Sequence, residues 1–343
     1  MISFILPQKP RIEIFHQYLA ESIKKDHYTN FGSNHNLLLQ KFSEIVGTDK
    51  IVLTANATLI LDGLHDILSR KCGLAYLPSF TFPATNQGCR VATIYGTTIS
   101  GGKDIGRAQW DCNSYTDTYA VSVNPFGSLA EPQRKPNTAY WIVDNAAGLL
   151  SQSKDWLEAG ADAVVYSLHA TKILSACEGG LVVFKYDNLY KEYCEYINFG
   201  FKVSPDGSRI TGICGSNHKM SELSAAWCLM NLHELDTEIE KREEISNSYK
   251  EFCDIYKIPH IYSLQAFWLL GIKDSTEMQK FAAEKHHIDI RPYYQTLQDA
   301  GRCHVTKRFN QKGFCLPTRS TLTKQETKSI LMMLQEAKDL NMI

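Results

Sequence analysis

The sequence predicts an α/β protein built on a large, mostly parallel sheet. Short apolar runs rich in β-branched residues recur between residues 51 and 186, and helical patterns separate several of them. Strands that alternate with helices form parallel sheets covered on both faces. The chain has 343 residues, of which 44% are hydrophobic, so it can bury a large core split over two domains of unequal size.

The first half of the chain alternates strands and helices. After an N-terminal arm, the apolar spacing of HNLLLQKFSEIVG predicts a helix that stops at Gly47. IVLTA is a strand, and the helical pattern of NATLILDGLHDIL follows it directly. Residues 73–89 and 91–99 continue the alternation, strands then end at 123, 144 and 168, and GGLVVFKY is a further strand. In such sheets ligands bind at the carboxyl ends of the strands.

The second half changes composition near residue 236. NHKMSELSAAWCLMNLHEL (217–235) predicts a buried helix, and the much more charged DTEIEKREEISNSYKEF follows it. Beyond these lie SLQAFWLLGI, IDIRPYY and a closing helix opened by a capping box of Thr323 and Glu326. We expect a large domain over residues 1–235 and a smaller C-terminal α+β domain over residues 236–343.

The charge balance argues against some partners. Thirty-six basic and 37 acidic residues give a net charge of −1, which removes the usual electrostatic reason to bind nucleic acid or an anionic membrane. No apolar run approaches a membrane span, and the N-terminus does not have the pattern of a signal peptide. Ten cysteines without a C-x-x-C motif favour buried free thiols over disulfides or a zinc site. We expect a cytoplasmic protein with a small ligand and no metal.

Lys172 is the first candidate functional residue. It lies in SLHATKILSACEGG, between a strand and the pair Gly179-Gly180. A lysine at the end of a strand commonly points into solvent. A Schiff-base lysine instead needs a site that lets its amine lose a proton near neutral pH. The spacing alone leaves both interpretations open.

Asp144 is the second candidate, because it closes the apolar strand AYWIV. Such an acid can cap a helix, bind magnesium, or pair with the protonated pyridine nitrogen of a pyridoxal phosphate ring. The 28 residues from Asp144 to Lys172 are enough for one crossover and another strand. Both side chains could therefore line one edge of one sheet.

Two further segments have weaker signals. The turn in LTANATLIL joins a strand to a helix N-terminus, where free backbone N–H groups and the helix dipole favour a phosphate. Any turn of this kind offers some of that character. Phe82 in PSFTFPAT is either an ordinary core aromatic or, beside a bound flat ring, a stacking platform.

Together these segments resemble the DegT/DnrJ/EryC1/StrS family of pyridoxal-phosphate sugar aminotransferases, which have the aspartate aminotransferase-like fold known as fold type I. The resemblance covers most of the chain, and SLHATK followed by EGG is its most specific part. The segments that match, in the family's order, are YTNFGSNHNLLLQKFSEIVG, LTANATLILDGL, PSFTFPAT, SVNPFG, IVDNAAG, SLHATKILSACEGG, NFGF, GSNHKMSELSAA and IDIRPYY.

The resemblance implies catalytic roles for two residues. Lys172 would hold pyridoxal 5′-phosphate as a Schiff base and then move a proton between the substrate and the cofactor. Asp144 would keep the pyridine nitrogen of the cofactor protonated, and Phe82 would stack on its ring. Relatives that dehydrate sugars carry histidine in place of this lysine, so Lys172 favours amino transfer.

The resemblance also implies how the phosphate would be bound. Ser167 and the backbone amides around Asn56 and Ala57 would contact it. Asn217 would reach the phosphate of the neighbouring subunit, so each site would be completed across a homodimer. A monomer should then be inactive.

Two positions depart from the family pattern. Asn56-Ala57 stand where the family commonly has a Gly-Thr pair, which removes one hydroxyl donor unless Thr58 replaces it. Ala147 stands where many members carry glutamine or histidine near the phenolic oxygen of the cofactor. His169 belongs to the family motif, and it either contacts the cofactor or packs the turn; we expect packing.

The function that the resemblance implies is transfer of an amino group from glutamate to a keto group of a nucleotide-linked deoxysugar. TNFG, NFGF and GSNHKMSE are most similar to members that act at C4 of dTDP-4-keto-6-deoxyglucose, as in O-antigen or capsule sugar synthesis. A 3-keto isomer and a UDP-linked sugar remain alternatives. A transaminase for small amino acids, with Arg291 or Arg319 on the α-carboxylate, is less favoured. So is a non-catalytic cofactor-binding regulator, because the chain lacks the length and the basic patch of a DNA-binding domain.

Overall fold

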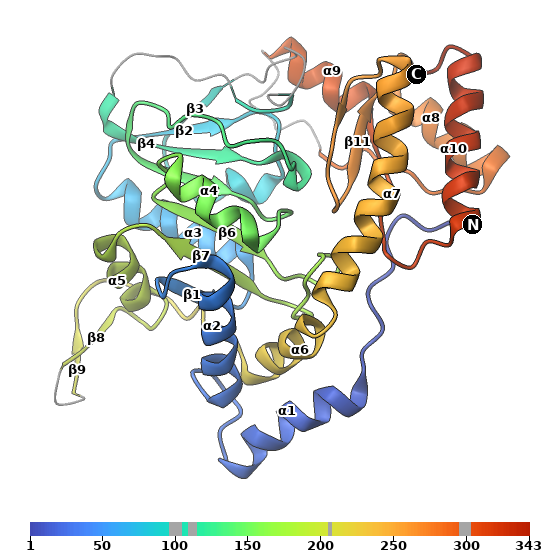
Figure 1. Ribbon diagram of the computed structural model, residues 1–343. Helices are drawn as coiled ribbons and strands as arrows, with labels where there is room; N and C mark the ends of the chain where they lie inside the picture. The colour runs from blue at the N-terminus through green and yellow to red at the C-terminus, as the bar shows by residue number, and fades with distance from the viewer. Residues whose placement is uncertain (96–104, 109–114, 205–207, 295–302) are drawn as a thin grey trace.

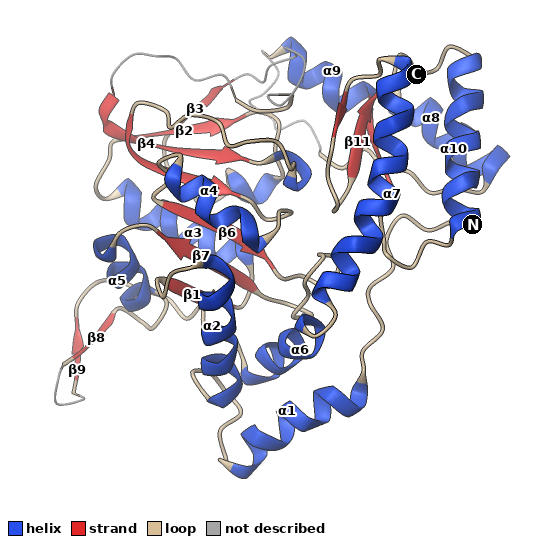
Figure 2. Cartoon of the chain, in the orientation of Figure 1, coloured by secondary structure: helices blue, strands red, loops and turns tan. Residues whose placement is uncertain are grey.

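A seven-stranded sheet forms the larger part of the protein (Figure 2). The computed structural model describes residues 1–95, 105–108, 115–204, 208–294 and 303–343. The strands of this sheet are β1 (Ile51–Thr54), β2 (Leu74–Pro78), β3 (Ala92–Tyr95), β4 (Tyr115–Val123), β5 (Thr138–Asp144), β6 (Ala163–Ser167) and β7 (Gly180–Phe184). Their order is β1-β7-β6-β5-β4-β2-β3, and only β7 runs antiparallel to its neighbours. The predicted mostly parallel sheet is confirmed.

Helices cover both faces of the sheet (Figure 1). One face packs against α2 (Ser33–Val46), α4 (Ser153–Glu158) and α6 (Glu222–Leu232), and the other against α3 (Ala57–Ser69) and α5 (Asp187–Tyr196). Successive side chains of a strand point to opposite faces, so Trp141 and Val143 join the first core and Ile142 joins the second. The sheet is therefore buried on both sides, as its apolar strands predict.

A second, three-stranded antiparallel sheet lies in the C-terminal part. It contains β10 (His260–Ile261), β11 (Phe267–Leu270) and β12 (Gly313–Leu316). A separate core joins β11 and β12 to α7 (Leu235–Tyr256), α8 (Ser275–His286) and α10 (Lys324–Asp339). The predicted boundary after residue 235 falls at the first turn of α7, and the division into two domains stays a prediction.

An aromatic cluster joins the two sheets. Phe80 and Phe126, from the loops after β2 and β4, pack with Trp268 of β11 and Phe309 of α9 (His304–Lys312). Tyr294 stacks on Phe126, with ring centroids 4.4 Å apart and planes 16° from parallel. These contacts fix the C-terminal sheet against the carboxyl edge of the large sheet.

Some elements differ from the prediction. The helix predicted over 217–235 begins only at Glu222, because Asn217 and Lys219 form bridges with Asn198 and Thr54 and Ser221 caps the helix by accepting from the backbone N–H of Ser224. The strand predicted over 91–99 is β3, and residues 96–99 lie outside the described part.

Several short elements were not predicted from the sequence patterns. They include α1 (Ile12–Lys24), the antiparallel pair β8 (Phe201–Val203) and β9 (Arg209–Thr211), and the 3₁₀ turns η1 (Pro83–Thr85), η2 (Pro125–Gly127) and η3 (Leu150–Gln152). Figure 1 shows β8 and β9 projecting beyond α5.

The cysteines agree only in part with the prediction of buried free thiols. The nine cysteines that the structure describes are all free, but only four of them are buried, so the expectation that most would be buried is wrong. Cys112 lies outside the described residues.

Among the described helices, none combines the length and the apolar character needed to cross a membrane.

A buried carboxylate fixes the start of α2. Glu222 is fully buried and accepts hydrogen bonds from the backbone N–H groups of Gly32, Asn34 and His35 at 2.9–3.0 Å. The Ser22 hydroxyl of α1 donates a further bond at 2.9 Å. A helix leaves its first N–H groups unsatisfied, and a negative charge there also interacts favourably with the helix dipole. Glu222 thus joins α1, α2 and α6.

We expect Glu222→Gln to lower the free energy of unfolding by about 2 kcal/mol or more, because the amide group would face buried N–H donors with one acceptor fewer. Chemical denaturation of the purified variant measures this. Glu234→Ala is the control, since Glu234 pairs with Arg11 while 61% exposed and should change the stability by about 1 kcal/mol at most. Equal stability of wild type and Glu222→Gln would contradict the anchoring role.

Candidate active site

The carboxyl ends of the parallel strands surround a cavity of about 630 Å³. Because β7 runs antiparallel to both β1 and β6, β1 points in the same direction as β6 and ends at the same edge. The cavity is lined by residues at or after the ends of β1, β2, β4, β5 and β6 and by the pair Tyr293-Tyr294. This is the position that the topology of the sheet predicts for a ligand.

Six of the seven predicted site residues line this cavity, namely Asn56, Ala57, Phe82, Asp144, Ser167 and Lys172. Asn217 is exposed and is not among the residues that line it. It nevertheless lies near the predicted phosphate turn, because the carbonyl oxygen of His218 accepts from the N–H of Ala55 at 2.8 Å. The structure therefore brings together every predicted site residue except the one expected to serve a partner subunit.

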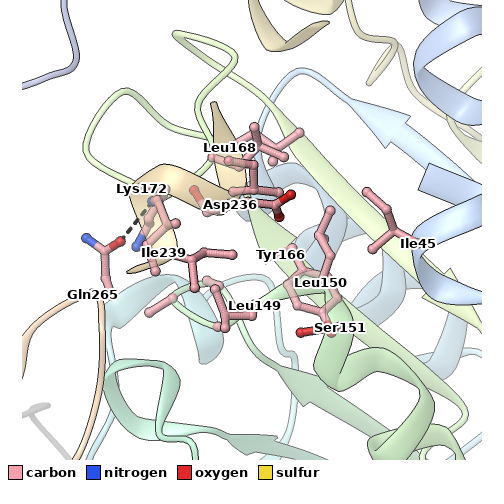
Figure 3. Close-up of a pocket in the computed structure, with 17 residues that line it drawn as sticks. Ile45, Leu149, Leu150, Ser151, Tyr166, Leu168, Lys172, Asp236, Ile239 and Gln265 are labelled. Atoms are coloured by element: carbon pink, nitrogen blue, oxygen red, sulfur yellow. Dashed lines mark hydrogen bonds between the residues drawn. The ribbon is translucent and has the colours of Figure 1, made fainter. Parts of the chain in front are cut away.

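Lys172 lines this cavity and also a smaller one of about 160 Å³, whose residues Figure 3 shows. The smaller cavity is mostly aliphatic, with Ile45, Leu150 and Ile239 in its wall and Asp236 at one side. Lys172 and Gln265 belong to the walls of both cavities. Lys172 is thus partly buried in the walls of two cavities, in contrast to the interpretation of Lys172 as a solvent-facing residue.

Burial changes the proton affinity of the Lys172 amine. Loss of hydration lowers its pKa to about 8, and the nearby carboxylate of Asp144 acts in the opposite direction. Near neutral pH an appreciable part of the amine is therefore unprotonated, as a nucleophilic lysine requires.

Asp144 is 4% exposed and is oriented by hydrogen bonds. The Thr85 hydroxyl donates to Oδ2 at 2.6 Å, and the N–H of Ala146 donates to Oδ1 at 3.1 Å. Burial raises the pKa of Asp144, while these two bonds and the Lys172 charge lower it. The magnesium interpretation gains no support, because no cluster of three or more His, Cys, Asp or Glu side chains suited to a metal occurs among the described residues.

The predicted phosphate turn lies at one side of the cavity. The Asn56 side chain caps α3 by accepting from the N–H of Leu59 at 2.9 Å, and Ala57 and Thr58 also line the cavity. The turn packs directly on β7 at Gly180, where a Cβ would lie only 2.5 Å from the carbonyl carbon of Asn56. A glycine is therefore required for this close approach.

The remaining predicted residues fall at the rim and the wall. Phe82 lines the cavity with 51% of its surface exposed, so its ring is available to a ligand. His169 also lines it, and its ring bonds to the Thr171 hydroxyl at 2.9 Å and lies 3.5 Å from the Glu178 carboxylate. Packing is thus only part of what His169 does, because its ring also forms part of the cavity wall.

Several lining residues were not predicted, among them Asn124, Thr171, Glu178, Gln265, Tyr293 and Tyr294. The tyrosine pair belongs to IDIRPYY, a segment already noted for its resemblance to the family. Gln265 had no comparable local signal.

Comparison with known proteins agrees with this geometry. The sequence model of the DegT/DnrJ/EryC1/StrS aminotransferase family matches residues 137–266, which include Asp144, Ser167, Lys172 and Gln265. Over this segment the chain is similar to this aminotransferase family. It is 25% identical to the dTDP-4-amino-4,6-dideoxy-D-glucose transaminase of Shigella dysenteriae, over 97% of this chain and 98% of that one. It is also 25% identical to the UDP-4-amino-4,6-dideoxy-N-acetyl-β-L-altrosamine transaminase of Campylobacter jejuni, over 66% of this chain and 64% of that one.

Solved structures share the fold. A proposed sugar aminotransferase from Streptococcus pneumoniae, in its PMP form, superposes with a TM-score of 0.81 at 16% identity and covers 100% of both chains. The PLP form of the same protein gives a TM-score of 0.78 and covers 99% of both chains. The predicted fold type I is confirmed. The predicted cofactor, pyridoxal 5′-phosphate, is confirmed for this aminotransferase family.

The residues present fit that cofactor. A flat phosphorylated pyridine with an aldehyde needs an amine, an acid for the ring nitrogen, a phosphate site and an apolar face. Lys172, Asp144, the N-terminus of α3 and Phe82 offer these four features around one cavity. The departures at Ala57 and Ala147 remove none of them.

We expect Lys172 of the cofactor-free protein to react with an amine-specific reagent at unusually low pH. With its pKa lowered to about 8, the amine is half unprotonated at that pH. An ordinary lysine, with a pKa of about 10.4, is then almost fully protonated. Mass spectrometry of the labelled peptides across a pH series gives the midpoint for each lysine, and Lys191 on the exposed side of α5 is the internal control. A shared midpoint for both residues would contradict the burial effect.

Proposed function

We propose that this enzyme transfers an amino group from glutamate to the keto group of a nucleotide-linked deoxysugar. The observation that carries the proposal is the convergence of the Lys172 amine and the buried Asp144 carboxylate on one large cavity. In the proposed order, glutamate gives up its amino group and leaves as 2-oxoglutarate before the keto sugar receives the nitrogen.

The cofactor and the protein residues have separate chemical roles. When bound, pyridoxal 5′-phosphate supplies an aldehyde that bonds to amines and a ring that accepts electrons. Lys172 would hold the cofactor through Nζ, and the same amine would carry a proton to and from the reacting carbon. Its lowered pKa lets Nζ both give and accept a proton near neutral pH.

The other site residues bind and orient. The Asp144 carboxylate, held by Thr85, would keep a proton on the pyridine nitrogen, and that positive charge would stabilise the ionised form of Asp144. Ser167 and the first backbone amides of α3, at Asn56 and Ala57, bind the phosphate. Phe82 covers one face of the ring and excludes water from it.

The arginines favour a sugar as the acceptor. A transaminase for small amino acids needs a cation for the α-carboxylate, but Arg291 pairs with Asp289 at 2.8 Å. Arg319 is buried and donates to the carbonyl oxygen of Ser3 at 3.0 Å and to the Thr321 hydroxyl at 2.7 Å. In the described part of the chain, no arginine lines the cavity.

Within the sugar class we propose dTDP-4-keto-6-deoxyglucose, aminated at C4. The relative from Shigella dysenteriae is named for a dTDP-linked 4-amino-4,6-dideoxy sugar and aligns with nearly the whole chain. A UDP-linked sugar is the second candidate, because the relative from Campylobacter jejuni is named for one. The product would serve O-antigen or capsule synthesis, and we place the enzyme in the cytoplasm.

We propose a homodimer with shared sites. Asn217 is exposed, lies outside the cavity of its own subunit and precedes His218, whose carbonyl oxygen accepts from the N–H of Ala55 at the phosphate turn. Phe199, whose N–H donates to the carbonyl oxygen of Ser216 next to Asn217, is 51% exposed and is suited to a subunit contact.

The function is tested with purified enzyme loaded with pyridoxal 5′-phosphate. We expect release of 2-oxoglutarate from glutamate when dTDP-4-keto-6-deoxyglucose is present, slower release with the UDP-linked analogue, and very little with small 2-oxo acids. Lys172→Ala should abolish turnover, because no other amine replaces Nζ, while Lys191→Ala should retain it. Efficient turnover of 2-oxo acids without turnover of any keto sugar would contradict the proposal.

Shared sites predict complementation between two inactive variants. Lys172→Ala and Asn217→Ala homodimers should each lose activity at low cofactor concentration. A mixed dimer carries both changes in one site and neither in the other, so mixing the two variants after mild dissociation should restore turnover. Mixtures that stay inactive although mixed dimers are detected by native mass spectrometry would rule out the proposed contribution of Asn217 to the partner's site.

A further inference from the structure

One side chain from the C-terminal part holds the peptide groups on both sides of Lys172. Nε2 of Gln265 donates to the carbonyl oxygen of Thr171 at 2.8 Å, and Oε1 of Gln265 accepts from the N–H of Ile173 at 3.1 Å. Figure 3 shows Gln265 reaching toward the Lys172 loop, with the second bond drawn as a dashed line. The side-chain amide of Gln265 therefore forms hydrogen bonds with the backbone on both sides of Lys172.

The loop needs such support because it has no regular structure. Residues 168–179 connect β6 to β7 without forming a helix or a strand, so their backbone groups lack a ladder of partners. The N–H of Lys172 donates to the carbonyl oxygen of His169 at 2.9 Å, but this bond joins two residues of the same loop. The Gln265 bonds tie the loop to a different part of the fold.

Gln265 is itself held in place. It is 8% exposed, and its backbone N–H donates at 3.0 Å to the Ser263 hydroxyl, which in turn donates to the carbonyl oxygen of Phe126 at 2.5 Å. On the other side, Arg242 of α7 donates to the carbonyl oxygen of Leu264 at 3.2 Å. The position of the Gln265 amide is thus set by both α7 and the loop after β4.

We propose that Gln265 is a positioning residue that fixes the backbone of Lys172, so that Nζ stays in the wall shared by the two cavities. The inference deepens the proposed function, because it rests on Lys172 being the catalytic amine. Its effect is geometric, since an amide does not titrate. Misplacing a catalytic group by about 1 Å can cost about 10²-fold in rate.

The surroundings of Lys172 allow this effect to be isolated. The titratable side chains that line the two cavities with Lys172 are Asp144, Tyr166, His169, Glu178, Asp236, Tyr293 and Tyr294. Gln265→Met keeps the length of the side chain, removes both hydrogen bonds and changes none of these groups. Asn231→Ala is a matched control, because its Nδ2 donates to the carbonyl oxygen of Ser175 in the same loop at 2.8 Å and Asn231 lines neither cavity.

The first measurement uses the full chain without cofactor and needs no substrate. In Gln265→Met we expect the pH midpoint for labelling of Lys172 to rise from about 8 toward the ordinary lysine value, because a released loop exposes the amine to water. In Asn231→Ala the midpoint should stay where it is in the wild type. An unchanged midpoint in Gln265→Met would overturn the proposal.

The second measurement is turnover of the loaded enzyme. We expect kcat of Gln265→Met to fall by about 10- to 100-fold with a smaller change in KM for the keto sugar, since the other residues that line the cavity remain. Gln265→Glu keeps an acceptor for the N–H of Ile173 and should recover part of kcat. It also replaces Gln265→Met if that variant does not fold. A folded Gln265→Met with wild-type kcat would overturn the proposal, as would equal losses in Gln265→Met and Asn231→Ala.

The two readouts separate this proposal from the proposed function. If the keto sugar is not a substrate but the labelling midpoint still depends on Gln265, the positioning role stands and only the assigned reaction fails. If turnover is observed and both Gln265→Met readouts match the wild type, the reaction stands and the positioning role is wrong.

Discussion

The opposed charges of Lys172 and Asp144 at one cavity are the constraint on which the rest of the site depends. Burial disfavours the charged form of each group, and each charge favours that of the other. The pKa of Lys172 is thus lowered and that of Asp144 raised, which brings the proton affinities of the two groups closer together, as a site that moves protons requires. The protein must compensate by orienting both groups, Asp144 through Thr85 and Ala146 and Lys172 through its loop.

Much of this arrangement could be predicted from sequence because it is local. Asp144 and Ser167 end apolar strands, and parallel strands place such ends along one edge, so the pattern of the strands already located the site. Lys172 was found through its motif rather than its spacing, since spacing alone did not separate a reactive amine from a solvated one. The sheet, its helices and the closing helix follow from periodicity in the same way.

What could not be predicted depends on contacts between distant segments. Gln265 meets the Lys172 loop across 92 residues, and nothing in SLQAFWLLGI marks the glutamine as different from any polar residue before a strand. Glu222 bonds to residues 187 to 200 positions earlier, and its own helical segment gives no sign of these partners. The helix predicted from residue 217 starts late for a similar reason, because its first residues pair with Asn198 and Thr54.

The first residues of the chain lie against its last third. Ile2 forms a bridge with Ile288, and the carbonyl oxygen of Ser3 accepts from Arg319, 316 positions away. Contacts of such long sequence separation form late, since a long loop must close first. During synthesis the segment around Ile2 therefore leaves the ribosome long before the residues with which it pairs. The nascent protein can assemble its large sheet well before its two ends meet.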